Sequence, residues 1–212
     1  MRRRDSLPII EPPADTEAPV DGDAAVHGVV LAAGTSSRFG DRNKLLEQVD
    51  GEPMVHRTAK TLLDANTAGV TVVVGYQAPE IRAAVSDLDV GTWTNEDYAD
   101  GQSTSVASGV AAARDRGADA VLVALGDMPA VTVETVNALI AAYDRTDNDA
   151  LAAAYDGRRG NPVLFDSRYF DALLDVEGDV GGRDILLEEA DAVAVETGDP
   201  GVLSDVDRPD DL

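Results

Sequence analysis

The chain has 212 residues, a formal net charge of −23 at pH 7 and no cysteine. The lack of cysteine excludes a disulfide framework, a thiolate metal site and a cysteine nucleophile. The negative charge argues against nucleic acid as a partner, because its phosphates would be repelled. No apolar run approaches the roughly 20 residues that span a bilayer, and the arginines at positions 2–4 are not followed by the apolar core of a signal peptide. We therefore expect a cytoplasmic protein without a membrane partner.

The positive residues are few and uneven. Two lysines and fifteen arginines stand against 40 acidic residues, and the two histidines form no ligand cluster. This composition is typical of proteins from a high-salt cytoplasm, where salt screens the repulsion that opposes the compact state. We expect a halophilic protein that loses structure on desalting.

The chain is expected to divide into a disordered, acidic and proline-rich tail at residues 1–25 and one domain at residues 26–212. Strands and helices alternate within that domain. In chain order, we expect a strand at residues 26–31, a helix at 53–65, a strand at 70–74, a short helix after Pro79, a strand at 92–94, a helix at 104–116, a strand at 120–125, a helix at 133–143, strands at 150–155 and 162–165, a helix at 183–189 and a strand at 192–196.

This alternation predicts an α/β protein. Its near-continuous apolar strands indicate a mostly parallel sheet covered by helices on both faces. The glycine turn at residues 157–160 predicts a hairpin, so one antiparallel element should make the sheet mixed.

Residues 29–44, VVLAAGTSSRFGDRNK, are the most informative segment. An apolar strand enters a loop of small residues whose backbone amides can close around phosphate oxygens, at the carboxyl end of the sheet where α/β proteins bind ligands. Arg38, Arg42 and Lys44 follow, and such a group of cations in so acidic a chain favours a phosphate site over an ordinary turn. The segment indicates a nucleoside triphosphate as the ligand.

Two better-known phosphate loops do not fit this segment. A Walker A loop ends in Gly-Lys-Ser/Thr, whereas Gly40 is followed by Asp41 and Arg42. A dinucleotide-binding loop needs a second glycine two places after the first, and that place is Ser36.

A metal-binding acid is expected at the end of another strand. Asp127 follows the apolar strand at 120–125, in the sequence LGDMP. Attack on an α-phosphate brings one anion against another, so nucleotidyl transfer needs a divalent cation, and Mg²⁺ prefers carboxylate oxygens. A cap of a turn or helix is the alternative role for Asp127, and a partner carboxylate can come from the acidic segment at 205–212.

A glycine loop also leads into the helix expected near residue 104. Ser103 or Thr104 is expected to cap this helix, and Gly101 and Ser103 can line a base pocket as well.

Six ordered blocks of sequence resemble the nucleotidyltransferases that finish molybdenum cofactor synthesis, within a wider family of sugar-type nucleotidyltransferases. The resemblance implies an Mg²⁺-dependent enzyme with a three-layer α/β/α Rossmann-like fold, a nucleoside triphosphate and a phosphorylated acceptor. The blocks are LAAGTSSRFGDRNK, GQSTSV at 101–106, LGDMP at 125–129, GNPVLF at 160–165, GDVGGR at 178–183 and DVDRPDDL at 205–212.

The same resemblance implies roles for individual residues. The implied nucleotide-binding residues are Leu31, Ala32, Ala33, Gly34, Thr35, Ser36, Arg38, Lys44, Gly75, Gly101 and Ser103. Those implied in catalysis are Arg38, Lys44 and Asp127. The implied metal ligands are Asp127, Asp207 and Asp205, and the implied acceptor-binding residues are Arg158, Arg159, Asn161 and Arg183.

The form LAAG, rather than LAGG, resembles the cytidylyl branch of the family. We therefore expect transfer of CMP from CTP to molybdopterin with release of pyrophosphate, and transient contact with molybdoenzyme maturation proteins. Alternatives are guanylyl transfer from GTP to molybdopterin or phospholactate, cytidylyl transfer to methylerythritol phosphate, and a regulator that binds a nucleotide without transfer. A glycosyltransferase would usually carry an Asp-x-Asp motif after a central strand, which LGDMP is not. Phe39 and Asn161 depart from the family pattern, where methionine and histidine are common.

Overall fold

The computed structural model describes residues 6–13, 24–36, 39, 42–176, 182–188 and 192–207. Its strands are β1 (Ile9–Ile10), β2 (Val26–Ala32), β3 (Gln48–Val49), β4 (Glu52–Pro53), β5 (Gly69–Val74), β6 (Gly91–Thr94), β7 (Ala120–Leu125), β8 (Ala150–Tyr155), β9 (Arg158–Asp166) and β10 (Ala192–Glu196). Its α-helices are α1 (Met54–Asp64), α2 (Ala78–Ala84), α3 (Gln102–Asp115), α4 (Val133–Arg145), α5 (Phe170–Leu174) and α6 (Arg183–Glu188). Short 3-10 helices lie at η2 (Lys44–Leu46), η3 (Tyr98–Asp100), η4 (Ser167–Tyr169) and η5 (Pro200–Leu203).

The described strands form an eight-stranded sheet in the order β1-β10-β8-β9-β7-β2-β5-β6, and a separate hairpin of β3 and β4. All neighbours in the large sheet are parallel except those of β9, which pairs antiparallel with β7 and β8. The predicted mostly parallel, mixed sheet is therefore confirmed. A hairpin joins β8 to β9 as predicted, but its turn lies at residues 156–157, and residues 158–160, predicted as turn, are the start of β9.

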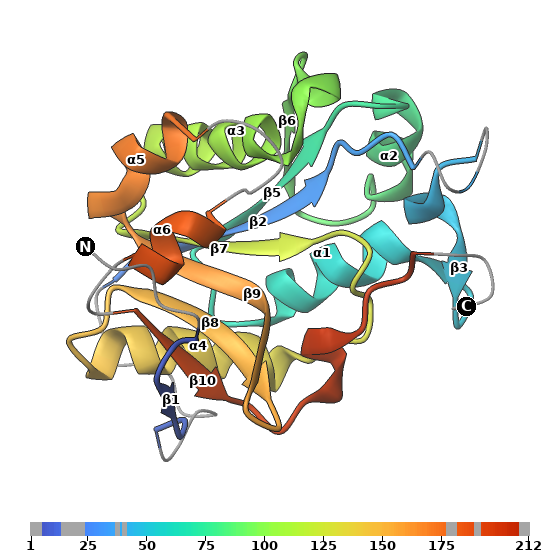
Figure 1. Cartoon of the computed structure of the whole chain (residues 1–212). Coiled ribbons are helices and arrows are strands. Elements are labelled where there is room, and N and C mark those ends of the chain that lie inside the picture. Colours follow the sequence, from blue (N-terminus) through green and yellow to red (C-terminus); the bar gives the residue numbers. More distant parts are fainter. Residues whose placement is uncertain are drawn as a thin grey trace.

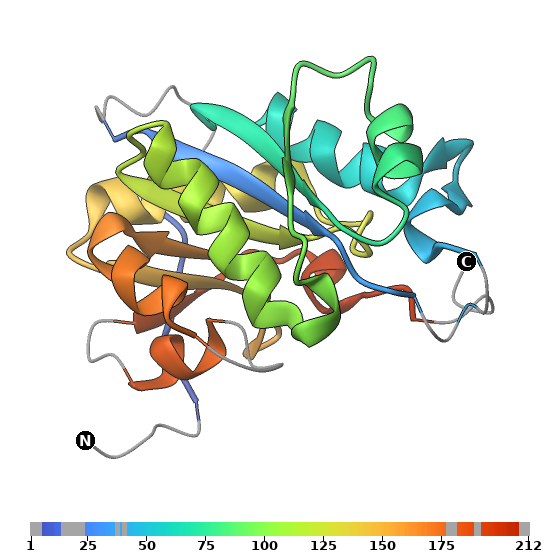
Figure 2. The ribbon, with the colours of Figure 1, turned by 90° about the horizontal axis from the view of Figure 1, so that it is seen from above.

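Helices cover both faces of the sheet, as Figures 1 and 2 show. Helices α1, α2 and α4 pack on one face through an apolar cluster that includes Leu62, Ile81 and Leu139. Helices α3, α5 and α6 pack on the other face, where the cluster includes Val110 and Leu173. The strands read as apolar runs because both of their faces are covered: every residue of β2 is buried. Within the described parts of the chain, every helix is too short or too polar to cross a lipid bilayer.

The strand registers bring three loops to one edge of the sheet. Leu31 of β2 lies opposite Leu125 of β7, and Ala32 lies opposite Val74 of β5. The segments that follow these strands therefore start side by side, and the Gly126 amide donates a hydrogen bond of 3.0 Å to the Leu31 carbonyl. This edge is where an open α/β sheet binds ligands.

Strand β1 lies within the range for which we expected a disordered tail. Ile9 and Ile10 pair in parallel with Ala194 and Val195 of β10 and so form an edge of the sheet. Leu7 is buried on the α3 face. A strand of two residues shows no alternation of apolar and polar side chains, so the sequence pattern did not reveal it. The rest of the expected tail at residues 14–23 lies outside the described parts.

Most predicted elements differ from the structure by one or two residues at their ends. Helix α3 begins at Gln102, two residues before its expected start, and α4 ends at Arg145. The β3–β4 hairpin was not predicted, because two strands of two residues carry almost no periodic signal.

Candidate active site

A cavity of about 420 Å³ opens at the carboxyl ends of β2 and β7. It is bounded by the loop after β2, by Lys44 and Asp127, by the segment that leads into α3, and by Asp207 near the end of the described chain. The lining residues are Leu31, Ala33, Gly34, Thr35, Ser36, Phe39, Lys44, Leu45, Tyr98, Ala99, Gly101, Gln102, Ser105, Leu125, Asp127 and Asp207. The predicted phosphate loop and the predicted metal-binding acid thus share one cavity.

The loop after β2 is held by its own side chains. Ser36 has a φ of 52°, in the left-handed region that is uncommon for residues other than glycine. Its hydroxyl donates to the Asn43 side-chain oxygen (3.2 Å) and accepts from the Lys44 amide (3.2 Å). The buried Asn43 oxygen also accepts from the Leu45 amide at 3.1 Å. Asn43 therefore ties the loop to the base of η2, a role that we did not predict.

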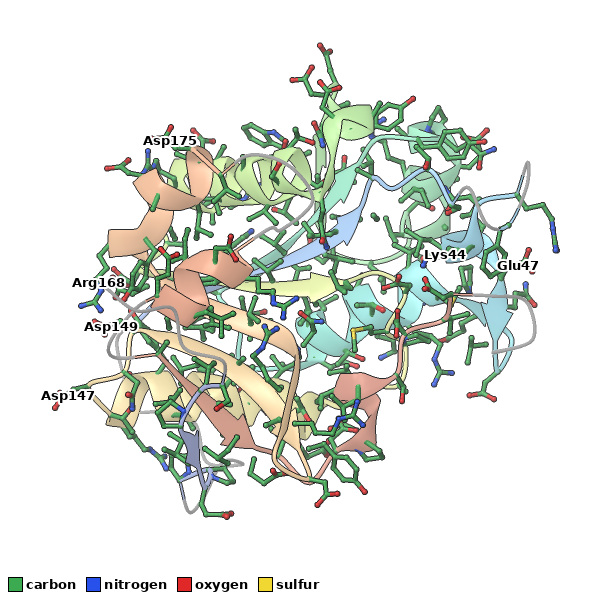
Figure 3. All side chains as sticks on the ribbon, in the orientation of Figure 1. Lys44, Glu47, Asp147, Asp149, Arg168 and Asp175 are labelled. Carbon is green, nitrogen blue, oxygen red and sulfur yellow. The ribbon has the colours of Figure 1, made fainter. Side chains whose placement is uncertain are left out.

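Lys44, which is labelled in Figure 3, contacts two acidic residues that are distant in sequence. Its Nζ lies 2.6 Å from Asp127 Oδ2 and 3.1 Å from Asp207 Oδ1. The side chains of Lys44 and Asp127 are each 17% exposed, so water screens this pair only partly. Burial disfavours the ammonium, but hydrogen bonds and negative charge from Asp127, and then Asp207, outweigh it and raise the pKa of Lys44. The lysine is therefore fully charged at neutral pH.

The carboxyl-terminal segment reaches Asp127 by crossing β9. Gly160 of β9 lies under η5 so closely that a Cβ would overlap the Val202 carbonyl oxygen. Beyond η5, the Val206 amide donates a 2.9 Å hydrogen bond to the Asp127 carbonyl, and the Val206 side chain packs against Phe39 and Met54. These contacts place Asp205 and Asp207 on either side of an anchored residue.

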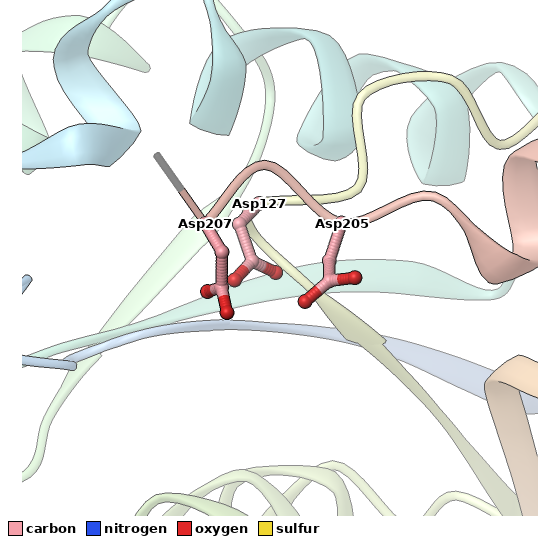
Figure 4. Close-up of side chains that lie close together, drawn as sticks. All are labelled: Asp127, Asp205 and Asp207. Carbon is pink, nitrogen blue, oxygen red and sulfur yellow. The ribbon is translucent and has the colours of Figure 1, made fainter. Parts of the chain in front are cut away.

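Asp127, Asp205 and Asp207 form a possible metal site. One carboxylate oxygen from each lies within 4.8 Å of the others, and the three side chains point to the same side of the chain (Figure 4). Three carboxylates supply only hard oxygen donors, which suit Mg²⁺ or Mn²⁺ and not a metal that prefers sulfur or imidazole. The residues present thus fit a divalent cation of this class.

Some predicted residues do not line the cavity. Gly75 lies beneath it, where a Cβ would come within 2.7 Å of Tyr98 and 2.8 Å of Ala33. Ala32 and Ser103 are buried in their elements, and Arg38 lies outside the described residues. Gln102 and Ser105 line the cavity from α3 instead, because the helix begins earlier than predicted and turns these residues toward it.

The predicted acceptor residues divide between the two faces of β9. Arg159, Asn161 and Arg183 line a second cavity of about 380 Å³, which shares Leu31, Gln102 and Leu125 with the first. Arg158 is exposed and does not line it. Successive residues of a strand point to opposite faces, so neighbouring arginines cannot enter the same cavity. Both arginines were expected in a turn before a strand at 162–165, where this alternation does not apply, so the structure was needed to distinguish Arg158 from Arg159.

The family model for the MobA-like NTP transferase domain matches residues 28–193. The chain belongs to this family. Among curated proteins, this MobA-like chain is 34% identical to the purine catabolism protein PucB of Bacillus subtilis over 87% of the chain and 92% of that protein. It is 30% identical to the nicotine blue oxidoreductase of Paenarthrobacter nicotinovorans over 93% of the chain and 97% of that protein.

Solved structures agree with the family. A nucleotidyl transferase from Methanothermobacter superposes with a TM-score of 0.76 at 26% identity, covering 88% of this chain and 94% of that one. A Mycobacterium tuberculosis H37Rv protein solved as a complex with manganese gives a TM-score of 0.72 at 25% identity, covering 89% and 96%. The MobA-like chain is therefore a nucleotidyltransferase with a Rossmann-like α/β fold.

Proposed function

We propose that this chain is a cytidylyltransferase that moves CMP from CTP to a phosphorylated acceptor, with molybdopterin as the first candidate, and releases pyrophosphate. The observation that carries the proposal is the contact of Lys44 with Asp127 and Asp207 at the wall of the cavity formed by the small-residue loop. A site that only bound a nucleotide would need the loop and the cation but not a converging group of acids.

The chain's own groups account for binding of the triphosphate. The small-residue loop after Leu31 and Lys44 line the cavity, and we propose that their amides and ammonium bind the phosphate oxygens there. As the acceptor phosphate oxygen bonds to the α-phosphorus, the bond to the bridging oxygen breaks and negative charge grows on pyrophosphate. Lys44, with Arg38 as a second predicted cation, offsets that charge. A phosphate nucleophile is already ionised near neutral pH, so these residues need no general base among them.

Asp127, Asp205 and Asp207 would hold the divalent cation, which we propose to be Mg²⁺. When bound, such a cation supplies positive charge that reduces the repulsion between the phosphates. The three carboxylates would hold it beside the loop, since Asp127 follows a buried strand and Val206 anchors the two other acids.

The preference for CTP rests on the LAAG sequence, in which Ala33 lines the cavity together with Tyr98. Thermal stabilisation by each of the four nucleoside triphosphates tests it, because a tightly bound ligand raises the melting temperature in proportion to RT ln(1 + [L]/Kd). The largest shift is expected with CTP; a larger one with GTP would favour the guanylyl alternative.

The reaction itself is tested by pyrophosphate release in high salt with Mg²⁺, CTP and each candidate acceptor: molybdopterin, methylerythritol phosphate or phospholactate. Release that depends on both CTP and one acceptor is expected. Nucleotide binding without release with any acceptor would indicate a regulator and contradict the proposal. The cytoplasmic location and the contact with molybdoenzyme maturation proteins stay predictions.

A further inference from the structure

Three cavities follow one another on the α3 side of the sheet, starting at the carboxyl ends of β2 and β7. The nucleotide cavity and the 380 Å³ cavity meet at Leu31, Gln102 and Leu125. At its other end the second cavity shares Arg159 and Arg183 with a third one of about 140 Å³. The cavities follow the strand order β2-β7-β9-β8-β10-β1: the first lies at β2 and β7, and the third includes Ile9 of β1 and Ala194 of β10.

The third cavity is built partly by the amino-terminal segment. Ser6, Leu7 and Ile9 line it together with Gly157, Arg159, Arg183, Leu187 and Ala194. This segment is fixed in place, since the Ala194 amide donates a 2.8 Å hydrogen bond to the Pro8 carbonyl and Leu7 is only 6% exposed. The family model matches residues 28–193 and so does not include this segment.

Arg159 and Arg183 stand together without an acidic partner among the residues that the structure describes. Burial, and then the positive charge of Arg183, lower the pKa of Arg159, although a guanidinium stays charged at neutral pH. In a chain with 40 acidic residues, two adjacent unpaired arginines at the junction of two cavities indicate a site for an anion from outside.

The second and third cavities differ in size, and each suits a different part of a ligand. The small cavity holds roughly four or five waters, which suits a single carboxylate or phosphate group. The 380 Å³ cavity is lined mainly by apolar side chains such as Val106, Val163 and Phe165, so it suits the less polar body of a molecule.

We propose that Arg159, Arg183 and the amino-terminal segment 6–10 form an anion subsite that binds an acidic group of the acceptor other than the one that attacks the nucleotide. The inference rests on the proposed transfer function. It narrows the acceptor to molecules with acidic groups at two places: the attacking group lies near Asp127, the body fills the second cavity, and the other acid lies between the arginines. Among the candidate acceptors, phospholactate has a second acid in its carboxylate but only a three-carbon body, which would not fill the second cavity, whereas molybdopterin has a body of suitable size and carries its other acidic group in its dithiolene sulfurs.

The subsite can be tested by NMR on the full chain, without an acceptor. The side-chain Nε–H signals of Arg159 and Arg183 are followed during titration with inorganic phosphate and, separately, with acetate, at constant ionic strength in KCl. Saturable shifts of both signals are expected. The anion that binds more tightly indicates whether the acidic group of the acceptor is a phosphate or a carboxylate. Linear, unsaturated shifts with both anions would overturn the subsite.

Matched variants locate the binding. Arg183→Gln removes one exposed guanidinium of the pair, whereas Arg158→Gln removes the exposed arginine next to Arg159 in β9, which lines neither cavity. Ser6→Asp adds a carboxylate to the wall of the third cavity, whereas Ser86→Asp adds one at the exposed end of α2. The first member of each pair should weaken anion binding about fivefold or more, by loss of a cation or by an added like charge, and the second should leave it unchanged. Equal effects within both pairs would contradict the proposal.

Asp127→Asn separates this inference from the proposed function. It should abolish pyrophosphate release and leave the anion titration as in the wild type. If the wild-type protein shows no transfer but its arginine signals still shift saturably with the anion, the proposed function is contradicted and the anion subsite is not.

Discussion

Lys44 Nζ lies 2.6 Å from Asp127 Oδ2, although the two residues are 83 positions apart in the sequence. The same ammonium also donates to Asp207 at 3.1 Å, across 163 positions. The Lys44 ammonium thus contacts two of the three carboxylates that could bind a metal ion. In this arrangement, Lys44 and a divalent cation compete for the same oxygens, and a nucleotide that draws the lysine toward its phosphates would free them.

Replacing Lys44 by methionine should therefore have opposite effects on two ligands. Mn²⁺ binding in the absence of nucleotide should become about tenfold tighter or more, because the cation no longer displaces an ammonium with charge-assisted hydrogen bonds of about 1.5–3 kcal/mol each. Binding of the triphosphate should weaken. Isothermal titration measures both, and Lys60→Met, which removes an exposed lysine paired with Asp64, is the control. Unchanged Mn²⁺ affinity would show that the two cations do not compete.

Asp127→Asn should lower the transfer rate by roughly 10²–10³ or more, the scale of losing one electrostatic group in a site. The fold should persist, since the Asp127 backbone carbonyl, which holds Val206, is unchanged. Single-turnover rates and the melting temperature are compared with those of Asp175→Asn, an exposed acid at the end of α5. A variant that keeps most of its activity would remove Asp127 from the site.

Two glycines should respond differently to alanine. At Gly75 a Cβ would lie 2.7 Å from the Tyr98 Cβ, so Gly75→Ala should lower the free energy of unfolding by about 1–3 kcal/mol and displace an aromatic wall of the cavity. At Gly34 no heavy atom lies within 4 Å of a Cβ, so Gly34→Ala should keep its stability and lose affinity for the nucleotide that approaches the loop. Denaturant unfolding and nucleotide titration distinguish the two; equal stability losses would contradict the packing at Gly75.

The buried His27 should make stability depend on pH. Its Nε2 lies 2.9 Å from Thr71 Oγ1, and burial, with the charge of Arg116 as a smaller cause, lowers the pKa of His27 to about 4. Because the unfolded histidine binds a proton near pH 6.5 and the folded one does not, stability is lost as pH falls between these values, by about 2 kcal/mol between pH 7.5 and 5. His27→Gln should flatten this part of the profile of unfolding free energy against pH. Parallel profiles would assign the acid sensitivity to the carboxylates alone.

The net charge of −23 should make the fold depend on salt. Removing KCl lengthens the screening distance, and each kcal/mol of added repulsion should lower the melting temperature by about 2–4 °C. Thermal melts across a KCl series measure this, with betaine at equal osmolality as the control, because it stabilises by exclusion without screening charge. Equal protection by betaine would contradict an electrostatic cause.

The sequence by itself determined the α/β class, the phosphate loop and the strand-end acid, because each rests on a local pattern: an apolar strand followed by small residues or by Gly126-Asp127. Strand registers then bring loops after parallel strands to one edge, so the meeting of Lys44 with Asp127 could also be expected. For Asp207 the sequence offered only the family resemblance. The tertiary structure shows why Asp207 joins them, since η5 and Val206 carry it across β9. It also decided which arginine of a neighbouring pair faces the second cavity, and that Leu7 and Ile9 close the sheet beside it. Those features depend on contacts between segments that are distant in sequence, and no local pattern records such contacts.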